Sequence, residues 1–327
     1  MSNLKIFSGG SNLPLTQKIC DKLNISLGDI YHHSFASKEI YCQFKENIRG
    51  EDVFLVQGAG DSSTSANDNL MQLLIMADAA RRASADRVSI VLPMFFYSRS
   101  DKKDKSRTPI SAKLIMDLFA ASGVDRILTM DLHAPQIQGF SNIPTDVLSF
   151  EPILIEYIKN NYKDNIVIMA PDVGAVKRAE KHAESLKCDF GFISKKRLSD
   201  EHVELQNIVG DVKDKTVIII DDLSESCGTL VQAAEACKKN GAIKVVCAIT
   251  HNCITQTGMN RLITAMEHSN VKNKNVYIDE FIHSNTINHW WSLKYKLQNI
   301  TQLDVSELFA KAIYNIHNNQ SISELFI

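Results

Sequence analysis

The segment from Val217 to Thr229 constrains this chain most, because an apolar run ends there in two carboxylates and a loop of small residues. Residues 217–220 are typical of a buried strand, which places Asp221 and Asp222 at its carboxyl end, where open α/β sheets bind ligands. Residues 229–239 have the pattern of a helix, whose amino terminus offers N–H groups and a favourable dipole to a phosphate. Because carboxylates also accept hydrogen bonds from vicinal hydroxyls, the segment predicts a site for a phosphorylated sugar.

Other interpretations of this loop stay open on its composition alone. An acidic pair after a strand can also cap a helix or bind a single Mg²⁺, and short motifs produce false positives. Cys227 lies inside the loop, where a small residue beside a phosphate is needed, so its size explains it better than thiol chemistry does.

Length and charge limit the class of protein. At about 150 residues per domain, 327 residues predict two domains. The net charge of −2 gives no reason to expect a nucleic acid or membrane partner. The first residues contain no apolar signal core, and no apolar run approaches the ~18 residues of a membrane span, so we expect a cytoplasmic protein. The seven scattered cysteines contain no Cys-x-x-Cys pair, which indicates reduced thiols and no zinc.

Apolar runs and helical patterns alternate along the chain. The runs are residues 5–8, 53–57, 88–92, 127–130, 166–169, 217–220 and 245–249, and helical spacing is found at 67–82, 111–122 and 176–186. This alternation predicts an α/β fold with largely parallel sheets, as two related doubly wound domains with a site between them. The predicted domains are residues 1–147 and 148–304, with a helix and tail at 305–327 that we expect to pack on the N-terminal domain.

Three more polar clusters follow predicted strands. Cations and acids alternate in residues 96–110, a composition that by itself is typical of a solvated surface. Because the segment follows a predicted strand, Arg99 could bind a polyphosphate there. His133, which lies beside Asp131, could hold Mg²⁺ together with Asp172 and phosphate oxygens. A lone His is, however, more often a packed residue. The triplet Lys195–Arg197 is by itself typical of a solvated turn, and beside a diphosphate it would act as a cationic lid.

These pieces together resemble the ribose-phosphate diphosphokinase family over nearly the whole chain. The matching segments are residues 6–9, 47–53, 67–71, 101–107, 131–134, 171–172 and 195–197, followed by the sugar loop, in which Glu225 and Ser226 replace the more usual Asp and Thr. The fold that the resemblance implies is type I phosphoribosyltransferase-like. A protein-kinase interpretation fails, since Asp189-Phe190-Gly191 lacks the catalytic-loop partner, and a P-loop is also absent from the sequence.

The resemblance implies an enzyme that transfers the diphosphoryl group of ATP to the 1-hydroxyl of ribose 5-phosphate, giving phosphoribosyl diphosphate and AMP for nucleotide biosynthesis. It implies Mg²⁺ as cofactor and self-association, as a homohexamer built from dimers in which a neighbouring subunit donates part of the adenine site. Two alternatives are a non-catalytic regulatory subunit of a synthetase assembly and a phosphoribosyltransferase.

The same resemblance implies a role for individual residues. The catalytic lid cations are Lys195 and Arg197, and the metal ligands are His133 and Asp172. Binding of ATP is expected from Phe35, Ser37, Glu39, Arg99, Ser100 and Asp101, and binding of ribose 5-phosphate from Asp221, Asp222, Glu225, Ser226, Cys227, Gly228 and Thr229. An allosteric site for phosphate and ADP would include Arg49, Ser106, Arg107 and Gln138. Ser37 and Ser100 depart from the family pattern, as does the lost Ser-Gly-Pro turn after His251.

Overall fold

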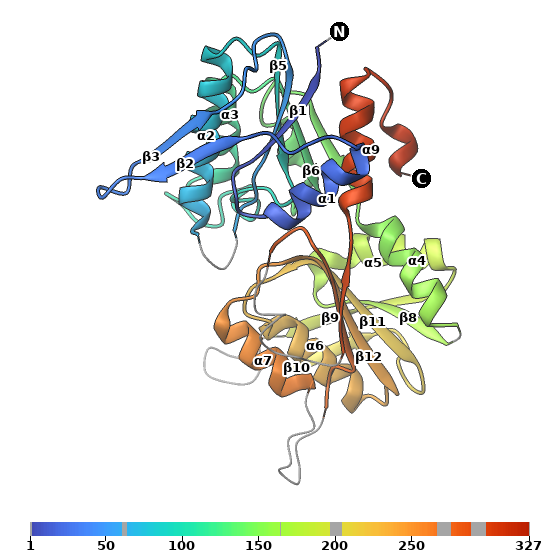
Figure 1. Cartoon of the computed structure of the whole chain (residues 1–327). Helices are drawn as coiled ribbons and strands as arrows, with labels where there is room; N and C mark the ends of the chain where they lie inside the picture. Colours follow the sequence, from blue (N-terminus) through green and yellow to red (C-terminus); the bar gives the residue numbers. More distant parts are fainter. Residues whose placement is uncertain are drawn as a thin grey trace. The chain divides into compact units, whose positions relative to one another are not determined.

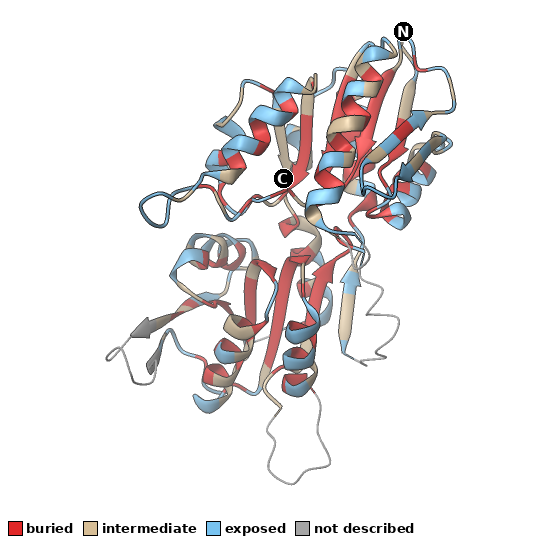
Figure 2. Ribbon diagram, turned by 90° about the vertical axis from the view of Figure 1, so that its left-hand side faces the viewer, coloured by how far each residue is buried: buried red, intermediate tan, exposed pale blue. Residues whose placement is uncertain are grey.

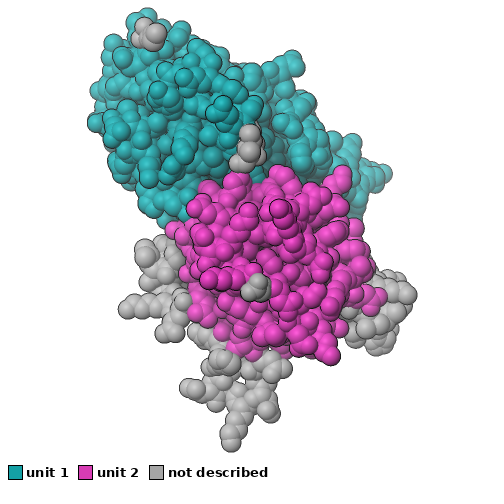
Figure 3. Space-filling view, turned by 90° about the vertical axis from the view of Figure 1, so that its right-hand side faces the viewer, with its two compact units in different colours: residues 1–150, 285–290, 304–327 teal, residues 151–284, 291–303 magenta. Residues whose placement is uncertain are grey.

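The chain forms two compact units, coloured separately in Figure 3. The computed structural model describes residues 2–60, 64–163, 165–196, 205–266, 276–288 and 299–326. Unit 1 comprises residues 1–150, 285–290 and 304–327, and unit 2 comprises residues 151–284 and 291–303. The chain therefore leaves unit 1 after Phe150 and returns to it near the C-terminus.

Unit 1 is built on a five-stranded parallel sheet in the order β1-β4-β5-β6-β7 (Figure 1). Its strands are β1 (Leu4–Ser8), β4 (Asp52–Val56), β5 (Arg87–Leu92), β6 (Arg126–Met130) and β7 (Thr145–Leu148). Its helices are α1 (Leu13–Leu23), α2 (Ala66–Arg82), α3 (Ser111–Ala121) and α9 (Ser306–His317), with short 3₁₀ turns η1 (Pro135–Gly139) and η3 (Ser323–Phe326). An antiparallel hairpin of β2 (Ile30–Ser34) and β3 (Ile40–Phe44) is a separate two-stranded sheet.

The core of unit 1 explains why these residues form these elements. All five residues of β4 are buried, as a strand covered on both faces requires. Helices α2 and α3 bury an apolar stripe against the sheet, where Phe119 lies edge-on to Phe95 at a centroid distance of 6.2 Å. Ser65 is the N-cap of α2, and its hydroxyl accepts a hydrogen bond from the N–H of Asp68.

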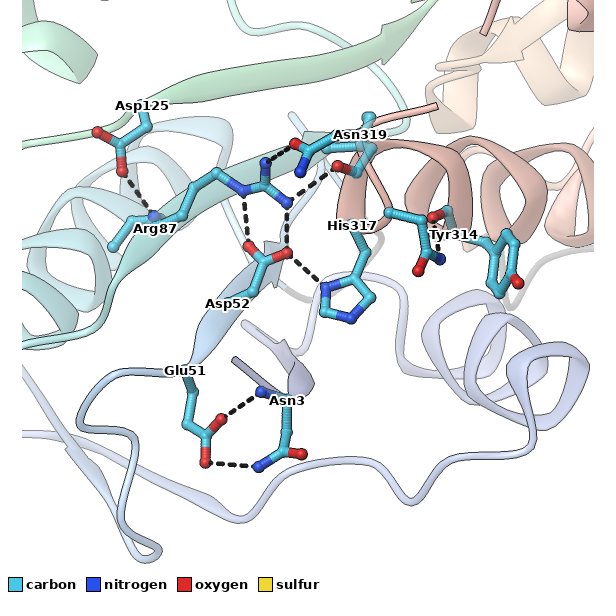
Figure 4. A network of polar contacts seen from close by, with 11 residues as sticks. Asn3, Glu51, Asp52, Arg87, Asp125, Tyr314, His317 and Asn319 are labelled. Carbon is cyan, nitrogen blue, oxygen red and sulfur yellow. Dashed lines mark hydrogen bonds and ion pairs between the residues drawn. The ribbon is translucent and has the colours of Figure 1, made fainter. Parts of the chain in front are cut away.

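The returning C-terminal segment is fixed to unit 1 at both ends of α9. At its start, Asp304 accepts hydrogen bonds from Lys18 Nζ at 2.7 Å and from the N–H of Ser306 at 2.9 Å. Burial would raise the pKa of Asp304, but these bonds and one from Asn285 outweigh it and hold the pKa at about 2. At its end, His317 contacts Asp52 in the polar network of Figure 4. The helix thus completes unit 1 as an integral element.

Unit 2 is built on a seven-stranded, mainly parallel sheet in the order β10-β9-β8-β11-β12-β13-β14. Its strands are β8 (Ile166–Ala170), β9 (Asp189–Lys196), β10 (Leu205–Val209), β11 (Thr216–Ser224), β12 (Lys244–Asn252), β13 (Glu280–Ser284) and β14 (Ile300–Leu303), with only the β9–β10 pair antiparallel. Its helices are α4 (Glu151–Asn161), α5 (Val176–Leu186), α6 (Gly228–Lys239) and α7 (Gln256–Met266), with a 3₁₀ turn η2 (Val173–Ala175).

The direction in which the chain adds strands changes within this sheet. From β8 the chain crosses through α5 to β9 on one side, whereas β11, α6 and β12 extend the sheet on the other side. Right-handed crossovers running in opposite directions place their helices on opposite faces, which makes the sheet doubly wound. Helices α6 and α7 bury Leu230, Ala234 and Leu262 on one face. Figure 2 shows the resulting buried strands in each unit.

The α/β class with largely parallel sheets, predicted from the alternation of patterns, is confirmed. Residues 205–209 are not among the predicted strands, but they form β10, which pairs with β9. Among the described helices, none combines the length and apolar character needed to cross a bilayer.

Candidate functional site

The change of direction in unit 2 lies between β8 and β11, and the acidic pair is found there. β11 pairs with β8 only as far as Ile219, but it stays paired with β12 as far as Ser224. The strand thus parts from β8 just before Asp221 and continues along β12. In open α/β sheets the opening beyond such a switch point is where ligands bind.

Asp221 and Asp222 form a coupled pair at this opening. The N–H of Asp222 donates to Oδ1 of Asp221 at 2.9 Å, and Asp222 is buried while Asp221 is half-buried. Burial raises the pKa of Asp221 to about 8, and the charge and side-chain hydrogen bond of the Asp222 carboxyl act in the same direction, whereas the bond from the N–H of Asp222 lowers the pKa. The guanidinium of Arg178 likewise opposes the increase only in part. Below that pH, Asp221 is held largely neutral, which limits repulsion of an anionic ligand.

The loop after the pair leads directly into α6. Cys227 adopts the left-handed conformation, with φ of 55°, and occupies the N-cap position. The side chain of Cys227 makes no capping hydrogen bond, while the N–H of Gly228 donates to Oγ of Ser226 at 3.4 Å, so other N–H groups of the first turn remain for a ligand. Cys227 is 1% exposed, and burial raises its pKa to about 11. The thiol is therefore a packing group, consistent with the small-residue explanation.

The loop rests on the start of α7. The N–H of Thr255 donates to the carbonyl of Glu225 at 2.9 Å, and a Cβ at Gly258 would lie only 2.2 Å from that same oxygen. Only glycine allows so close an approach, so α7 fixes the backbone of the loop. Arg261, one turn further along, donates from Nη1 to the carbonyl of Ser226 at 3.2 Å. No sequence pattern points to Thr255, Gly258 and Arg261, because their spacing carries no signal of contact with a loop some thirty residues earlier.

Asp172 follows β8, on the neighbouring strand of the same opening. Its Oδ1 accepts from the N–H of Gly174 at 2.9 Å, which caps η2, and the residue is half-exposed. One carboxylate oxygen is thus held by the protein, while the second can face a ligand. Asp172 and the pair at 221 and 222 belong to adjacent strands of unit 2 and share its carboxyl edge.

The strands β9 and β10 extend past this edge as a two-stranded arm. β9 pairs with β8 only up to Phe192, and its remaining residues pair with β10, where Lys195 is opposite Gln206. The backbone of Lys195 therefore lies beyond the carboxyl edge of β8. Arg197, the second predicted lid cation, lies outside the described residues.

In unit 1 the predicted nucleotide residues follow β5. Arg99 is exposed and Ser100 is half-exposed, with the carbonyl of Ser100 accepting from the N–H of Ala112 at 3.1 Å. Asp101 is only 8% exposed and accepts from Nε2 of Gln136 at 2.8 Å. Asp101 thus links the segments after β5 and β6. Its position indicates that Asp101 supports the segment that carries Arg99.

His133 follows β6 at the same edge of unit 1 and is exposed. The preceding Asp131 has a φ of 38°, and its Oδ1 accepts from the N–H of Phe150 at 3.4 Å. His133 belongs to unit 1 and Asp172 to unit 2. Across the described residues, no three His, Cys, Asp or Glu side chains are grouped closely enough to hold a metal by themselves. Taken by itself, the half-exposed carboxylate of Asp172 is the kind of oxygen ligand that Mg²⁺ prefers, and Mg²⁺ keeps waters and substrate phosphates among its other ligands.

The predicted adenine residues are at the tip of the β2–β3 hairpin. Phe35 is 48% exposed, and its N–H donates to the carbonyl of Glu39 at 2.9 Å, which closes the turn. The hydroxyl of Ser37 donates to the carboxylate of Glu39 at 2.8 Å. The hairpin presents an aromatic face made of Tyr31, His33, Phe35 and Tyr41.

The hairpin also forms one wall of a cavity of about 590 Å³ in unit 1. Most of the lining residues are of polar type, and they come from the ends of β1 and β2 and the start of α2, including Gly9, His32, Lys38 and Asn69. His32 bonds through Nε2 to the carbonyl of Ser8 at 3.1 Å, and burial lowers its pKa, so it is the neutral imidazole. This cavity could not be predicted from the sequence, because its wall combines segments that are separated in the chain.

The four expected allosteric residues are divided between the two edges of the first sheet. Arg49 precedes β4 and donates to Oγ of Ser84 at 3.2 Å, just before β5, which places it at the amino edge. Gln138 is in η1, which follows β6 at the carboxyl edge, and Ser106 and Arg107 lie exposed in the segment after β5. One copy of unit 1 therefore does not bring Arg49 and Gln138 together.

Comparison with known proteins agrees with this geometry. A family model described as the N-terminal domain of ribose phosphate pyrophosphokinase matches residues 4–123, and one described as a phosphoribosyl synthetase-associated domain matches residues 192–327. A crystal structure of phosphoribosylpyrophosphate synthetase from Mycobacterium smegmatis is 34% identical, with a TM-score of 0.87 over 97% of this chain and 100% of that chain. A purine phosphoribosyltransferase from Pyrococcus horikoshii is 28% identical over 32% of this chain and 76% of its own, with a TM-score of 0.26.

Proposed function

Because this chain belongs to the ribose phosphate pyrophosphokinase family, we propose that it is a ribose-phosphate diphosphokinase that uses ATP as its diphosphoryl donor. The acceptor is ribose 5-phosphate, and the products are phosphoribosyl diphosphate, a precursor for nucleotide biosynthesis, and AMP. The observation that carries the proposal is the acidic pair at the switch point of unit 2, followed at once by the open amino terminus of α6.

The acceptor sugar is bound by both halves of this segment. Asp221 and Asp222 accept hydrogen bonds from the ribose hydroxyls, and residues 225–229 place backbone N–H groups around the 5-phosphate. The raised pKa of Asp221 leaves the pair with about one negative charge at neutral pH, so it can orient hydroxyls while repelling the phosphate less. Burial of Asp222 and its bond to Asp221 keep the pair in one geometry.

The donor nucleotide is assigned to unit 1. Arg99 offers a planar guanidinium to the polyphosphate, with Ser100 beside it and Asp101 holding the segment through Gln136. Phe35, Ser37 and Glu39 are exposed on the hairpin and supply the adenine contacts of a neighbouring copy. This arrangement requires self-association, and a homohexamer built from dimers meets the requirement. In that assembly, Arg49, Ser106, Arg107 and Gln138 would form an effector site from more than one copy.

In the reaction, the 1-hydroxyl oxygen of ribose bonds to the β-phosphorus while the bond from that phosphorus to the α,β-bridging oxygen breaks. The bridging oxygen leaves with AMP, and the hydroxyl proton passes to solvent water. Such transfers depend on positioning and on cations that stabilise charge on the moving group. Lys195, on the arm beyond the edge of β8, and Arg197 supply those cations. Mg²⁺ held by His133 and Asp172 would neutralise charge on the donor phosphates.

The test is to incubate the purified protein with ATP, Mg²⁺ and ribose 5-phosphate and to follow the phosphates by ³¹P NMR. We expect AMP and phosphoribosyl diphosphate to appear in equal amounts. Consumption of phosphoribosyl diphosphate with a purine base would instead identify a phosphoribosyltransferase. Absence of both reactions in a folded, correctly assembled sample would identify a regulatory subunit and contradict the proposal.

A further inference from the structure

Arg261 brings a positive charge onto the loop that the proposed function assigns to the 5-phosphate. Its Nη1 donates to the carbonyl of Ser226 at 3.2 Å, and a Cβ added at Gly228 would lie 3.5 Å from the same nitrogen. The guanidinium thus lies over the small residues between the acidic strand end and α6. Its five N–H groups leave donors for a second acceptor beyond the Ser226 carbonyl.

The position of Arg261 is set by backbone packing. Its helix, α7, contacts the loop through Thr255, whose N–H and Oγ1 both donate to the carbonyl of Glu225, at 2.9 and 3.3 Å. Gly258 follows on the same face of α7, in contact with that carbonyl, and Arg261 follows Gly258 by three residues. Because α7 has no freedom to move away from the loop without losing these contacts, the charge is held in place.

The loop needs such a charge to hold a phosphate dianion. The acidic side chains of this segment, in Glu225 and the preceding pair, are carboxylates, and the segment contains no Lys or Arg. Arg261 bonds directly to the backbone of the loop, through Nη1 and the carbonyl of Ser226. Its field reaches the interior as well, since it lowers the pKa of the Cys227 thiol against the larger effect of burial.

We propose that the guanidinium of Arg261 forms part of the 5-phosphate subsite and selects a phosphorylated over an unphosphorylated pentose. The backbone N–H groups of the loop then fix the orientation of the phosphate, and Arg261 supplies charge that the loop lacks. This inference rests on the proposed function, because it assigns the phosphate to the same loop.

The test compares three variants that separate charge from hydrogen bonding. Arg261→Lys keeps the charge, Arg261→Gln keeps an amide donor for the Ser226 carbonyl without the charge, and Arg261→Met keeps neither. Isothermal calorimetry with ribose 5-phosphate measures affinity, and steady-state kinetics measures kcat and both KM values. Lys239→Met is the control, since it removes an exposed cation from the far end of α6.

A lost hydrogen bond to a charged group weakens binding by about 10-fold to 100-fold. We expect the affinity for ribose 5-phosphate to fall by this factor in both the Gln and Met variants. In the Lys variant the affinity should stay within about threefold of wild type. The KM for ATP should be unchanged in all three variants. Lys239→Met should behave as wild type.

Two results would overturn the assignment of charge to Arg261. One is wild-type affinity in the Gln variant with weak binding in the Met variant, which would leave Arg261 as a support for the Ser226 carbonyl. The other is wild-type affinity in all three variants. Failure of the wild-type protein itself to bind ribose 5-phosphate is a separate outcome, because it would overturn the proposed function together with this inference.

Discussion

Nδ1 of His317 lies 2.8 Å from Oδ2 of Asp52, although 265 residues separate the two in the sequence (Figure 4). Asp52 begins β4 and His317 ends α9, so the contact fixes the C-terminal helix to the amino edge of the first sheet. Arg87 completes the network, since its Nε donates to Oδ1 of Asp52 at 2.8 Å and its Nη2 to the carbonyl of Ile316 at 3.0 Å. The Asp52 side chain is only 2% exposed, so it depends on these partners.

Arg87→Met should destabilise unit 1 strongly. The substitution leaves the buried carboxylate of Asp52 without its bidentate partner, which costs about 3 kcal/mol of unfolding free energy. Urea unfolding followed by circular dichroism measures the loss. Arg82→Met is the matched control, because Arg82 forms only an exposed pair with Asp78, and it should leave the unfolding curve unchanged. Equal unfolding midpoints for the two variants would contradict the role given to the network.

Asp221→Asn should stabilise the free protein near neutral pH while removing sugar binding. The pKa of Asp221 is raised from about 3.8 to about 8 by folding, so the native state binds a proton that the unfolded chain releases. Stability therefore falls as pH rises through the window from about 4 to about 8. Below this window Asp221 carries no penalty, and above it the full penalty persists without further change with pH. The amide carries no such penalty. Thermal melts should show a higher midpoint for the variant near pH 7.5 and no difference near pH 4, whereas equal midpoints at both would contradict the coupling.

Gly258→Ala should damage the sugar loop without unfolding unit 2. The added Cβ would lie 2.2 Å from the carbonyl of Glu225, a backbone atom that cannot move alone, so the loop must shift. We expect the KM for ribose 5-phosphate to rise at least ~10-fold, since a misplaced site loses binding and orientation. Gly60→Ala is the control, because a Cβ there meets nothing within 4 Å. An unchanged KM in the Gly258 variant would show that α7 does not position the loop.

Lys195→Ala should lower kcat by at least ~10², the scale of losing one preorganised donor to the transition state. Its backbone position on the arm past the edge of β8 supports this role. Affinity for ribose 5-phosphate should stay within a few-fold of wild type, because the sugar loop is untouched. Quenched-flow measurement of AMP gives the rate, with Lys239→Ala as the control. Near-normal turnover would remove Lys195 from the mechanism.

Elements with a clear local pattern were the ones that could be predicted from sequence. The predicted strand at residues 217–220 falls inside β11, and the predicted helix at 176–186 matches α5, because continuous β-branched runs and a 3.6-residue period are local signals. The β2–β3 hairpin was missed, because its strand Ile30–Ser34 is polar and mostly exposed. Local pattern cannot detect a strand whose stability comes from its partner and from the packing of Ile30 and Phe44 on the core of unit 1.

The residues of the candidate site also fall into those with a local sequence signal and those without one. The chain itself determined the acidic pair and the small-residue loop, because a strand end, two carboxylates and a helix start are neighbours in sequence. Only the tertiary structure decided that β11 parts from β8 after Ile219, that Gly258 and Arg261 lie against the loop, and that α9 closes unit 1 through Asp52. Those contacts join segments separated by tens to hundreds of residues, and they depend on sheet order and close backbone approach, which leave no periodic trace in the sequence.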